Sequence, residues 1–593
     1  MNITPLGSLA RTHTCGELTP AHAGQEVVLL GWVHRVRDLG ASLVFLDIRD
    51  RHGLTQVVAR DNEALAEAAK SLRSEYVIAV RGQVTLRTAD AVNPKMPTGA
   101  VEVAAAEIRL LNDAKVPPFP IADESPVAEE MRLRYRYLDL RRPRMQHNIA
   151  LRHRATMALR KYFDEQGFLE IETPILTKST PEGARDYLVP SRVHPGEFYA
   201  LPQSPQIFKQ ILMIAGMDRY FQIVKCFRDE DLRADRQPEF TQVDIEISFA
   251  TEDLVFTVLE GAMASLLAVI GQEVPRPFRR MPYADAIARY GSDKPDLRAG
   301  MEIQDLSSAF RDTSFSVFRG ALDAGGEVRG FVIPGAAKYS RRELDELVEQ
   351  AKALGAGGLV WARAPEGTVQ SPALKAAGED VLRAALAMSG AGAADLLVMA
   401  AGPHAPTSRL LGALRLHAAR KEQLLDPRRF EFLWVVDFPM FEWLEEEQRY
   451  EFMHHPFTAP LESDRHLLES DQGRARARAY DLVLNGSEIA GGSIRIHDQA
   501  LQRLIFKLLG ISDEEAKLRF GFFVDALEYG TPPHGGIAIG LDRVVAMMAG
   551  EASIRDVMAF PKTAQAQDLM AGAPSTVDPR QLRELRIRPE PPS

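Results

Sequence analysis

The stretch FRDEDLRADRQPEF at residues 227–240, continued by TQVDIEISFA at residues 241–250, is the most informative part of this chain. It predicts a strand–loop–strand hairpin whose loop carries too many charges for a simple turn. In the second strand, every other residue from Val243 to Phe249 is apolar and every other residue from Gln242 to Ser248 is polar, so one face would meet a core. The polar face is suited to form the floor of a binding site. The alternative interpretation is a solvated edge hairpin with surface ion pairs.

Length and composition indicate an ordinary globular chain. Its 593 residues are 46% hydrophobic and 26% charged, which suffices for roughly three to four domains. The formal net charge of −10 gives no global basic field, so contact with nucleic acid would need local patches, and the arginine-rich run at residues 132–144 is one candidate.

Two features of the sequence bear on the compartment. The only cysteines, Cys15 and Cys226, are far apart, which supports neither a disulfide framework nor a cysteine-based zinc site. The N-terminal residues lack a signal pattern, and no run approaches the about 18 apolar residues of a membrane span. We therefore predict a cytoplasmic protein without a membrane segment.

Residues 27–111 predict a five-stranded barrel. Three strand-like segments precede an Ala-rich helical stretch and two follow it, which is the order of an OB barrel. Such barrels bind single-stranded nucleic acid on exposed aromatic rings beside a cationic groove. Phe45 lies in the second predicted strand and Gln56 in the third. The competing interpretation is that Phe45 packs in the barrel core.

The remaining sequence divides at changes of composition. Prolines mark a linker near residues 112–128, because proline does not support regular backbone pairing. A helix is predicted from Asn148 to Gly167, followed by a strand, FLEIETPIL, that ends near Pro174. An Ala/Gly-rich α+β module without candidate chemistry interrupts the next domain, and the end of the chain reads as a poorly anchored tail.

Three segments in order carry a resemblance to a known family. They are the helix and strand with Pro174, the FRDE hairpin at 227–230, and GIAIGLDR at 536–543, and they resemble motifs 1, 2 and 3 of class II aminoacyl-tRNA synthetases. Further segments, which are STPEGARDY at 179–187, QSPQIFKQ at 203–210, MHHPFT at 453–458 and GSEIAGGSIRIH at 486–497, resemble the bacterial-type aspartyl-tRNA synthetases of class IIb.

The resemblance implies a multidomain α+β fold. The catalytic part would be a class II antiparallel sheet flanked by helices, with an inserted α+β domain and an N-terminal OB-fold barrel. The implied domains are an anticodon-binding barrel at 1–111, a hinge at 112–140, a catalytic domain at 141–296 and 421–565, the inserted domain at 297–420, and a C-terminal extension at 566–593.

The resemblance also implies the activity. The family activates L-aspartate with ATP to aspartyl-adenylate and pyrophosphate and then transfers aspartate to the terminal ribose of tRNA(Asp). ATP would be bound by Arg228, Asp229, Glu230, Gln237, Phe240, Glu488, Gly540, Leu541, Asp542 and Arg543, among which Arg228, Glu488 and Arg543 would be catalytic. A guanidinium suits this chemistry because its planar fork holds phosphate or carboxylate with two parallel bonds.

Aspartate and metal sites follow from the same resemblance. Aspartate would be bound by Glu182, Gln206, Lys209, Arg228, Asp244, His454, His455 and Arg495. Arg495, with Lys209 as its partner, would meet the side-chain carboxylate. Asp481 and Glu488 would hold Mg²⁺, although a spacing of seven on one strand places them on opposite faces unless the Asn485–Gly486 turn reverses the chain. No zinc is expected, because no cysteine lies near the histidine pair His454–His455 in the sequence.

Transfer RNA would be bound at two places. Arg233 and Arg236 of the charged loop resemble residues that read the base beside the acceptor end, and Phe45 and Gln56 resemble anticodon-reading positions. The segment around Pro174 resembles the class II dimer interface, which implies a homodimer.

Three rival functions remain open from the sequence. A non-discriminating enzyme would also charge tRNA(Asn), but Leu39 stands where such bacterial enzymes can carry histidine and favours tRNA(Asp) alone. A non-catalytic tRNA-binding paralogue would be expected to lose part of the phosphate-binding set, which is present here. Free asparagine synthesis would not need the N-terminal barrel.

Overall fold

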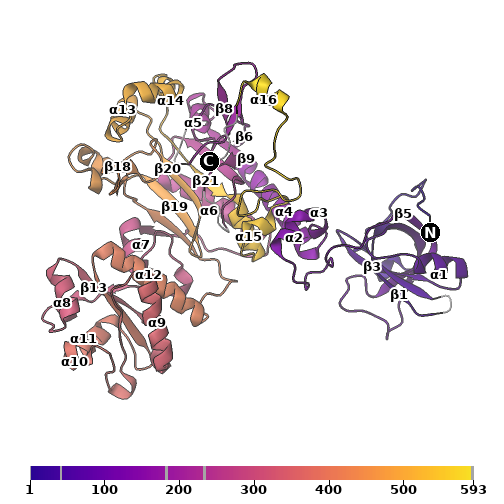
Figure 1. Cartoon of the computed structure of the whole chain (residues 1–593), viewed down its shortest axis with the longest axis horizontal. Helices are drawn as coiled ribbons and strands as arrows, with labels where there is room; N and C mark the ends of the chain where they lie inside the picture. The colour runs from indigo at the N-terminus through magenta and orange to yellow at the C-terminus, as the bar shows by residue number, and fades with distance from the viewer. Residues whose placement is uncertain (1, 41–42, 181–183, 231–234, 589–593) are drawn as a thin grey trace. The chain divides into compact units, whose positions relative to one another are not determined.

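A computed structural model describes residues 2–40, 43–180, 184–230 and 235–588 (Figure 1). The chain forms two compact units. Unit 1 comprises residues 1–150 with two short C-terminal segments, 559–563 and 567–574, and unit 2 comprises nearly all of the remaining chain. Among the described residues, no helix is long and apolar enough to cross a membrane.

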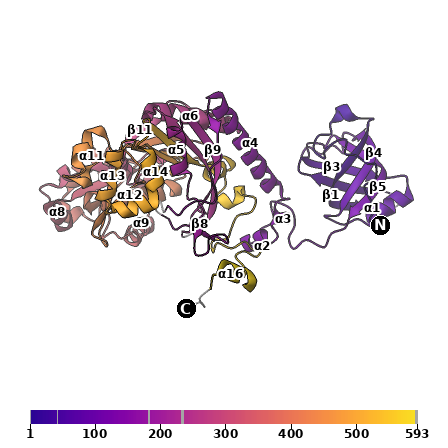
Figure 2. The same ribbon diagram turned by 90° about the horizontal axis from the view of Figure 1, so that it is seen from above.

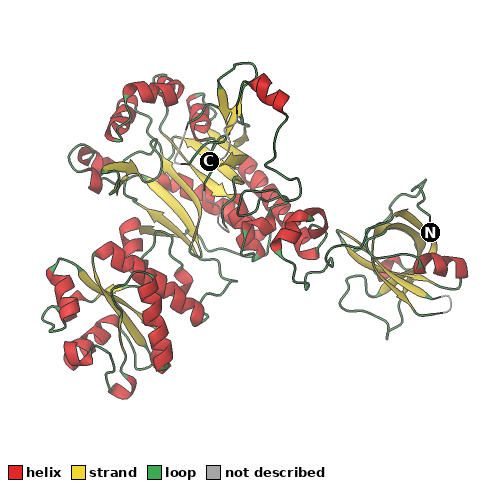
Figure 3. Ribbon diagram, in the orientation of Figure 1, coloured by secondary structure: helices red, strands yellow, loops and turns green. Residues whose placement is uncertain are grey.

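Unit 1 contains a closed barrel with strand order β1-β2-β3-β5-β4. Its elements are β1 (Glu26–Asp38), β2 (Val44–Asp50), β3 (Gly53–Ala59), α1 (Glu63–Lys70), β4 (Val77–Leu86) and β5 (Val101–Asn112). Alternate residues of each strand, such as Val27 and Leu29 of β1, fill the barrel core. The predicted barrel and the position of its helix are confirmed, and both are visible in Figure 3.

The arginine-rich run at 132–144 is largely committed to internal ion pairs. It spans α2 (Glu129–Arg134), α3 (Arg136–Asp139) and the start of α4 (Pro143–Glu165). The fully buried Asp139 accepts from Arg136 at 2.5 Å and from Arg132 at 2.9 Å. Because these guanidinium groups neutralise a buried carboxylate, much of the positive charge of the run is balanced within the fold.

Unit 2 is built on an eight-stranded sheet with order β11-β16-β19-β20-β21-β10-β9-β6. Its strands are β6 (Leu169–Glu170), β9 (Arg219–Phe227), β10 (Glu239–Ser248), β11 (Arg279–Pro282), β16 (Phe432–Val436), β19 (Ala479–Leu484), β20 (Ser487–Ile494) and β21 (His534–Gly540). The six central strands pair antiparallel, as expected for this fold. The two edge strands, β6 and β11, pair parallel to their neighbours and make the sheet mixed.

Helices cover one face of this sheet and leave the other face to a polar site. The C-terminal part of α4, α6 (Glu252–Ala268) and α15 (Leu541–Ala549) pack on the covered face, and Figure 2 shows α4 and α6 alongside β9. Val243, Ile245 and Ile247 lie in that core, as the alternation predicts. Phe249 does not: β10 ends at Ser248, and Phe249 turns outward with φ 56° and 71% exposure.

The segment around Pro174 differs from its prediction. The helix ends close to the predicted cap, since α4 stops at Glu165 and Gly167 has φ 76°. FLEIETPIL forms a strand only at Leu169–Glu170. Pro174 cannot donate a ladder hydrogen bond, which limits the length of this edge strand.

Between residues 297 and 420 lies a separate four-stranded sheet, β12-β13-β15-β14. It consists of β12 (Gln304–Asp305), β13 (Glu327–Ile333), β14 (Val360–Ala362) and β15 (Leu396–Gly402), with α8 (Ser316–Asp323), α9 (Arg341–Ala353), α10 (Leu374–Ala377), α11 (Glu379–Ser389) and α12 (His404–Lys421) around it. Two apolar clusters, one on each face, give it a core of its own. Helix α7 (Tyr283–Tyr290), which follows β11 of the eight-stranded sheet, packs against α12.

Smaller elements complete unit 2. They are α5 (Gln206–Ile214), α13 (Gln499–Leu508), α14 (Asp513–Ala526), and the two-stranded sheets β7 (Leu188–Pro190) with β8 (Phe198–Ala200) and β17 (Phe441–Leu444) with β18 (Arg449–Phe452). The predicted C-terminal tail contains a short helix, α16 (Pro579–Leu585), which has no buried residue.

Candidate active site

A cavity of about 810 Å³ opens over the polar face of the large sheet. Most of the predicted site residues line it, namely Gln206, Lys209, Arg228, Glu230, Arg236, Gln237, Phe240, Asp244, His454, His455, Asp481, Glu488, Arg495, Gly540, Asp542 and Arg543. The sequence separation among them exceeds 300 residues. Their convergence follows from the strand order, which places β10, β20 and β21 side by side.

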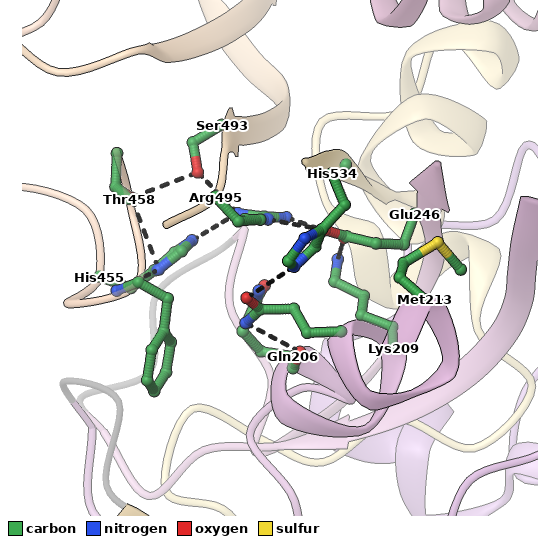
Figure 4. Close-up of polar contacts among 12 residues, drawn as sticks. Gln206, Lys209, Met213, Glu246, His455, Thr458, Ser493, Arg495 and His534 are labelled. Carbon is green, nitrogen blue, oxygen red and sulfur yellow. Dashed lines mark hydrogen bonds and ion pairs between the residues drawn. The ribbon is translucent and has the colours of Figure 1, made fainter. Parts of the chain in front are cut away.

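One end of the cavity, here called the buried end, is a network of four charged side chains, three of which, Lys209, Glu246 and Arg495, are labelled in Figure 4. Arg495 donates to both oxygens of Glu246, at 2.9 Å from Nε and 3.1 Å from Nη2. Lys209 Nζ of α5 lies 2.8 Å from Asp244 Oδ1 and 3.5 Å from Glu246 Oε2. All four side chains are at most 1% exposed. Two cations and two carboxylates therefore balance each other inside the protein.

The protonation states follow from this arrangement. Burial alone would favour the neutral acid, but Arg495 and Lys209 outweigh it and hold the pKa of Glu246 below its usual value. Burial lowers the pKa of His454 to about 4, with the charge of Arg495 acting in the same direction. The pKa of His455 is lowered well below its usual value for the same two reasons. Both imidazoles are thus neutral at pH 7.

Several buried polar atoms around this network have no hydrogen-bond partner among the described residues. They are Asp244 Oδ2, Gln206 Nε2 and His454 Nε2. Buried polar groups are nearly always satisfied, so atoms left open at a cavity wall indicate where a ligand binds. Asp244 Oδ2 can accept a hydrogen bond from a cation, and the two neutral side-chain nitrogens lie in the same region. Arg495 and Lys209 supply positive charge next to them. A small ligand carrying both an ammonium and a carboxylate fits this pattern.

The other end of the cavity, here called the open end, carries partly exposed guanidinium groups. Arg228 follows the end of β9, and its guanidinium lies 5.1 Å from the ring centroid of Phe240. Arg236 pairs with Glu230 at 3.2 Å, with 45% and 27% of the two side chains exposed. Such solvated pairs are weak and can be exchanged for a stronger anion.

Arg543 and Asp542 lie at the start of α15, but they differ in availability. Arg543 donates to the carbonyl of Glu488 and lies 3.4 Å from Asp235. Asp542 is buried and uses both oxygens internally, accepting from Arg152 at 2.5 Å and from the Thr241 backbone at 2.7 Å. The Asp542 carboxylate therefore has a structural role: it links Arg152 of α4 to the backbone of β10.

Asp481 and Glu488 come together because β19 and β20 form a hairpin. Asn485 and Gly486 form its turn, and both have positive φ, 51° and 81°. A register shift pairs Val483 with Glu488 and so brings Glu488 to the face that carries Asp481. The condition set by the sequence spacing, that the turn reverse the chain, is met.

The acid pair offers a cradle for a cation. A side chain at Gly491 would lie 2.9 Å from Asp481 Oδ1 and 3.5 Å from Glu488 Oε1, so both carboxylates converge over this glycine. Burial raises the pKa of Asp481 well above its usual value, and the charge of Glu488 raises it further. Two carboxylates facing an open cavity fit a hard divalent cation that takes its other ligands from phosphate and water. Within the described residues, no cluster of three or more His, Cys, Asp or Glu side chains could hold a metal.

Some predicted site residues stand elsewhere. Asp229 pairs by backbone with Arg185 outside the cavity lining, and Leu541 is buried in the core at the start of α15. Glu182 and Arg233 lie outside the described residues.

On the barrel of unit 1, Phe45 and Gln56 share the outer surface. Phe45 is half-buried and absent from the core cluster, and the guanidinium of Arg37 lies 5.7 Å from its ring centroid. Gln56 accepts from Arg37 at 2.8 Å and donates to Glu102 at 2.8 Å. This places an aromatic ring beside a hydrogen-bonded polar cluster, as single-strand binding by a barrel requires.

From the sequence alone, no site role is assigned to three further residues: Asp293 and Lys294, which line the cavity, and Glu246, which lies next to it. Glu246 holds both Arg495 and Lys209, and its signal was present in the polar alternation of β10. Asp293 and Lys294 line the cavity from the segment that follows α7. Their approach depends on long-range packing, for which the sequence carries no local signal.

Comparison with known proteins identifies the family. A model described as tRNA synthetases class II (D, K and N) matches residues 128–564, and one described as an OB-fold nucleic acid binding domain matches residues 27–111. The chain is a class II tRNA synthetase. Relatives of this synthetase include the aspartate–tRNA(Asp/Asn) ligase of Caldanaerobacter subterraneus subsp. tengcongensis, 53% identical over 98% of this chain and 99% of that protein. The aspartate–tRNA ligase of Ruminiclostridium cellulolyticum is also 53% identical, over 98% of each.

Solved structures agree with the synthetase fold. The asparaginyl-tRNA synthetase of Pyrococcus horikoshii complexed with asparaginyl-adenylate matches with a TM-score of 0.58 at 19% identity, covering 94% of this chain and 98% of that one. The aspartyl tRNA synthetase of Entamoeba histolytica matches with a TM-score of 0.56 at 18% identity, covering 95% and 94%. At these identities the likeness concerns the fold.

Proposed function

We propose that this class II synthetase is an aspartate–tRNA ligase. It activates L-aspartate with ATP to aspartyl-adenylate and pyrophosphate and then transfers aspartate to the 3′-terminal ribose of tRNA(Asp). The observation that carries the proposal is the buried end, where Arg495 and Lys209 stand behind the open acceptor Asp244 Oδ2. The full-length relatives named for aspartate support the same amino acid.

Selectivity for aspartate follows from charge. The ligand's ammonium donates to Asp244 Oδ2, and its side-chain carboxylate accepts from Arg495 and Lys209. Asparagine would present a neutral amide, which bonds to these two cations less strongly than a carboxylate does. A hydrogen bond to a charged group contributes about 1.5–3 kcal/mol, so two such contacts support strong rejection of the amide.

ATP occupies the open end in this proposal. Adenine stacks on Phe240, and Arg228 moves from its position near that ring to bridge the α-phosphate and the attacking carboxylate. Arg543 neutralises charge on the outer phosphates. The reaction needs no protein nucleophile, because the substrate's own carboxylate attacks; positioning and electrostatic stabilisation supply the catalysis.

Asp481 and Glu488 would hold Mg²⁺ in the cradle over Gly491. When bound there, the ion neutralises charge on the triphosphate oxygens. The chain's own contribution is the hairpin that keeps the two carboxylates together.

Pyrophosphate exchange tests the activation step. With purified protein, ATP and labelled pyrophosphate, exchange should depend on L-aspartate and be far weaker with asparagine, glutamate or lysine. Exchange with asparagine but not aspartate would overturn the amino-acid assignment. A complete lack of exchange with any amino acid would favour the non-catalytic tRNA-binding alternative.

The barrel reads the anticodon in this proposal, with Phe45 as a stacking platform and Gln56 as a base-edge contact. Phe45→Leu should raise the KM for tRNA(Asp) in aminoacylation and leave pyrophosphate exchange unchanged, because exchange needs no tRNA. A change in both assays would contradict a role confined to tRNA.

Charging of tRNA(Asn) as well is a second candidate. The name of the Caldanaerobacter relative, an aspartate–tRNA(Asp/Asn) ligase, favours it. Leu39, which is 65% exposed in the loop after β1, favours tRNA(Asp) alone. Aminoacylation of purified tRNA(Asp) and tRNA(Asn) with aspartate decides between them.

A homodimer is also proposed. The segment that resembles the class II dimer interface exposes the large apolar side chains Leu169, Ile175 and Leu176 beside the edge strand β6. Apolar side chains clustered at an open sheet edge are typical of an interface. Sedimentation equilibrium should give twice the chain mass, and Leu176→Glu should shift it toward the monomer.

A further inference from the structure

The segment at residues 291–300 connects α7 to the inserted sheet and also reaches the catalytic cavity. Asp293 and Lys294 are part of the cavity lining. Lys294 is exposed toward solvent, whereas Asp296, two residues later, is buried. The segment therefore places the Lys294 side chain at the cavity, whereas Asp296 is held in the protein interior.

The anchoring holds the segment that carries Lys294 against the hairpin of the acid pair. A side chain at Gly486, in the β19–β20 turn, would lie 3.1 Å from Asp296 Cβ, so the segment packs directly on the hairpin that carries Asp481 and Glu488. Lys294, Asp481 and Glu488 also line the same cavity. Lys294 is thus close to the proposed position of the outer phosphates.

Lys294 differs from two other cations of the open end, Arg236 and Arg543, in its partners. Arg543 lies within 3.4 Å of Asp235, and Arg236 pairs with Glu230. Across the part of the chain that the structure describes, Lys294 Nζ has no carboxylate within ion-pair distance. A lysine with no ion-pair partner among the described residues, in the lining of the cavity proposed to hold ATP, is available to a phosphate.

The inserted domain holds this segment in place. Arg415 of α12 is 1% exposed and donates to the carbonyls of Asp296 at 3.1 Å and Gly300 at 2.9 Å. Its guanidinium also lies 5.0 Å from the ring centroid of Tyr290. Arg298 adds a bond to the Asp296 carboxylate at 2.7 Å. A buried arginine that binds two carbonyls of one segment fixes the backbone path of that segment.

We propose that Lys294 binds the β- and γ-phosphates of ATP and the departing pyrophosphate, and that Arg415 of the inserted domain is the positioning residue for the segment that carries it. This inference rests on the proposed function. In the activation step a carboxylate oxygen of aspartate bonds to the α-phosphorus, the bond from that phosphorus to the bridging oxygen breaks, and the electron pair leaves with pyrophosphate. The ammonium of Lys294 neutralises charge that grows on this leaving group.

Lys294→Met tests the phosphate contact. Loss of one charge-assisted bond should raise the KM for ATP in pyrophosphate exchange by about 10-fold or more, with the KM for aspartate within about twofold of wild type. Calorimetry should show weakened binding of inorganic pyrophosphate and of a non-hydrolysable ATP analogue. Binding of a non-hydrolysable aspartyl-adenylate analogue, which lacks both outer phosphates, should be unchanged. Lys375→Met, an exposed lysine of the inserted domain outside the cavity, is the matched control.

Arg415→Lys tests the positioning role. It keeps the buried charge but cannot reach both carbonyls with a planar fork. We expect a higher KM for ATP, an unchanged KM for aspartate, and no further loss in the Lys294→Met/Arg415→Lys double variant, because both substitutions act on one contact. A purely structural role for Arg415 would instead lower the melting temperature and give additive effects.

Three outcomes overturn the inference. They are unchanged ATP and pyrophosphate binding in Lys294→Met, a raised KM for aspartate instead of ATP, or a defect confined to the KM for tRNA. Each requires that the wild-type chain exchange pyrophosphate with aspartate. If the wild type fails that assay, the proposed function fails and the inference falls with it, so the two failures are distinguishable.

Discussion

The two ends of the cavity use charge in opposite ways. At the buried end, Lys209, Asp244, Glu246 and Arg495 are at most 1% exposed and pair with one another. At the open end, the Arg236–Glu230 pair and the Arg543–Asp235 pair are partly solvated, with side-chain exposures between 27% and 57%.

This difference suggests that the buried end selects the amino acid, whereas the open end binds the triphosphate. A buried network is costly to assemble and costly to break, so it keeps one geometry and rejects ligands of the wrong charge. A solvated network costs little to rearrange, so its guanidinium groups can leave their protein partners when a triphosphate arrives. Substitutions at the buried end should therefore affect stability and activity together, and those at the open end should affect activity alone.

Arg495→Leu should give the largest effect. Aspartate-dependent pyrophosphate exchange should fall below detection, and the free energy of unfolding should fall by about 3–5 kcal/mol, because two buried carboxylates, Asp244 and Glu246, are left with one cation between them. Lys209 remains 3.5 Å from Glu246 but must then balance Asp244 as well. Exchange kinetics and urea unfolding measure the two losses. Retained exchange at ordinary aspartate concentrations would refute the role of Arg495.

The double variant Glu246→Gln/Arg495→Leu is the control for this prediction. Removing the carboxylate together with its partner should restore much of the stability and none of the activity. If activity returned together with stability, the loss of activity in Arg495→Leu would result from unfolding and not from a lost contact with aspartate.

Arg228→Ala should come second. Its guanidinium has no ion pair among the described residues that would be lost, so we expect the free energy of unfolding to change by less than about 0.5 kcal/mol. The rate of exchange should fall by about 100-fold or more, since the arginine is proposed to hold both reacting groups. A large loss of stability would break the distinction between the two ends.

Much of the fold was predictable because it rests on local periodicity. The barrel strands and the polar face of β10 follow from alternation that one face of a strand must satisfy. The parallel edges of the large sheet were not predictable, since strand direction depends on how distant segments return to the sheet. Phe249 was assigned to the core because alternation does not reveal where a strand ends.

The candidate site shows a similar division. Resemblance in short motifs selected residues that do line one cavity, such as Arg228 and Arg543. Spacing alone left Asp481 and Glu488 ambiguous, because the register shift in β20 that brings them together leaves no mark in the sequence. Lys294 reaches the cavity through contacts between segments almost 200 residues apart, such as Asp296 with Gly486, and no local pattern encodes them.

Phe240→Leu should have a moderate effect at the open end. Base–aromatic stacking contributes about 1–3 kcal/mol, so the KM for ATP should rise by about 10-fold, while the KM for aspartate and the melting temperature stay near wild type. Phe240→Tyr retains the ring face and should remain near wild type in all three measurements. Equal losses in both variants would show that Phe240 supports packing and does not stack on the base.

His454→Asn should give the smallest effect and bears on the buried end. The pKa of His454 is about 4 in the folded chain and near 6.5 when unfolded, because burial disfavours the imidazolium. Between these values the unfolded state binds more protons, so stability is lost as pH falls from 6.5 toward 4. From pH 7 to 5.5 this histidine should account for about 1 kcal/mol of that loss, and His454→Asn should remove it from urea unfolding curves. His497→Asn, the same change at an exposed histidine, should leave the pH dependence as in wild type; an equal change in both variants would mean that the slope does not arise from the buried end.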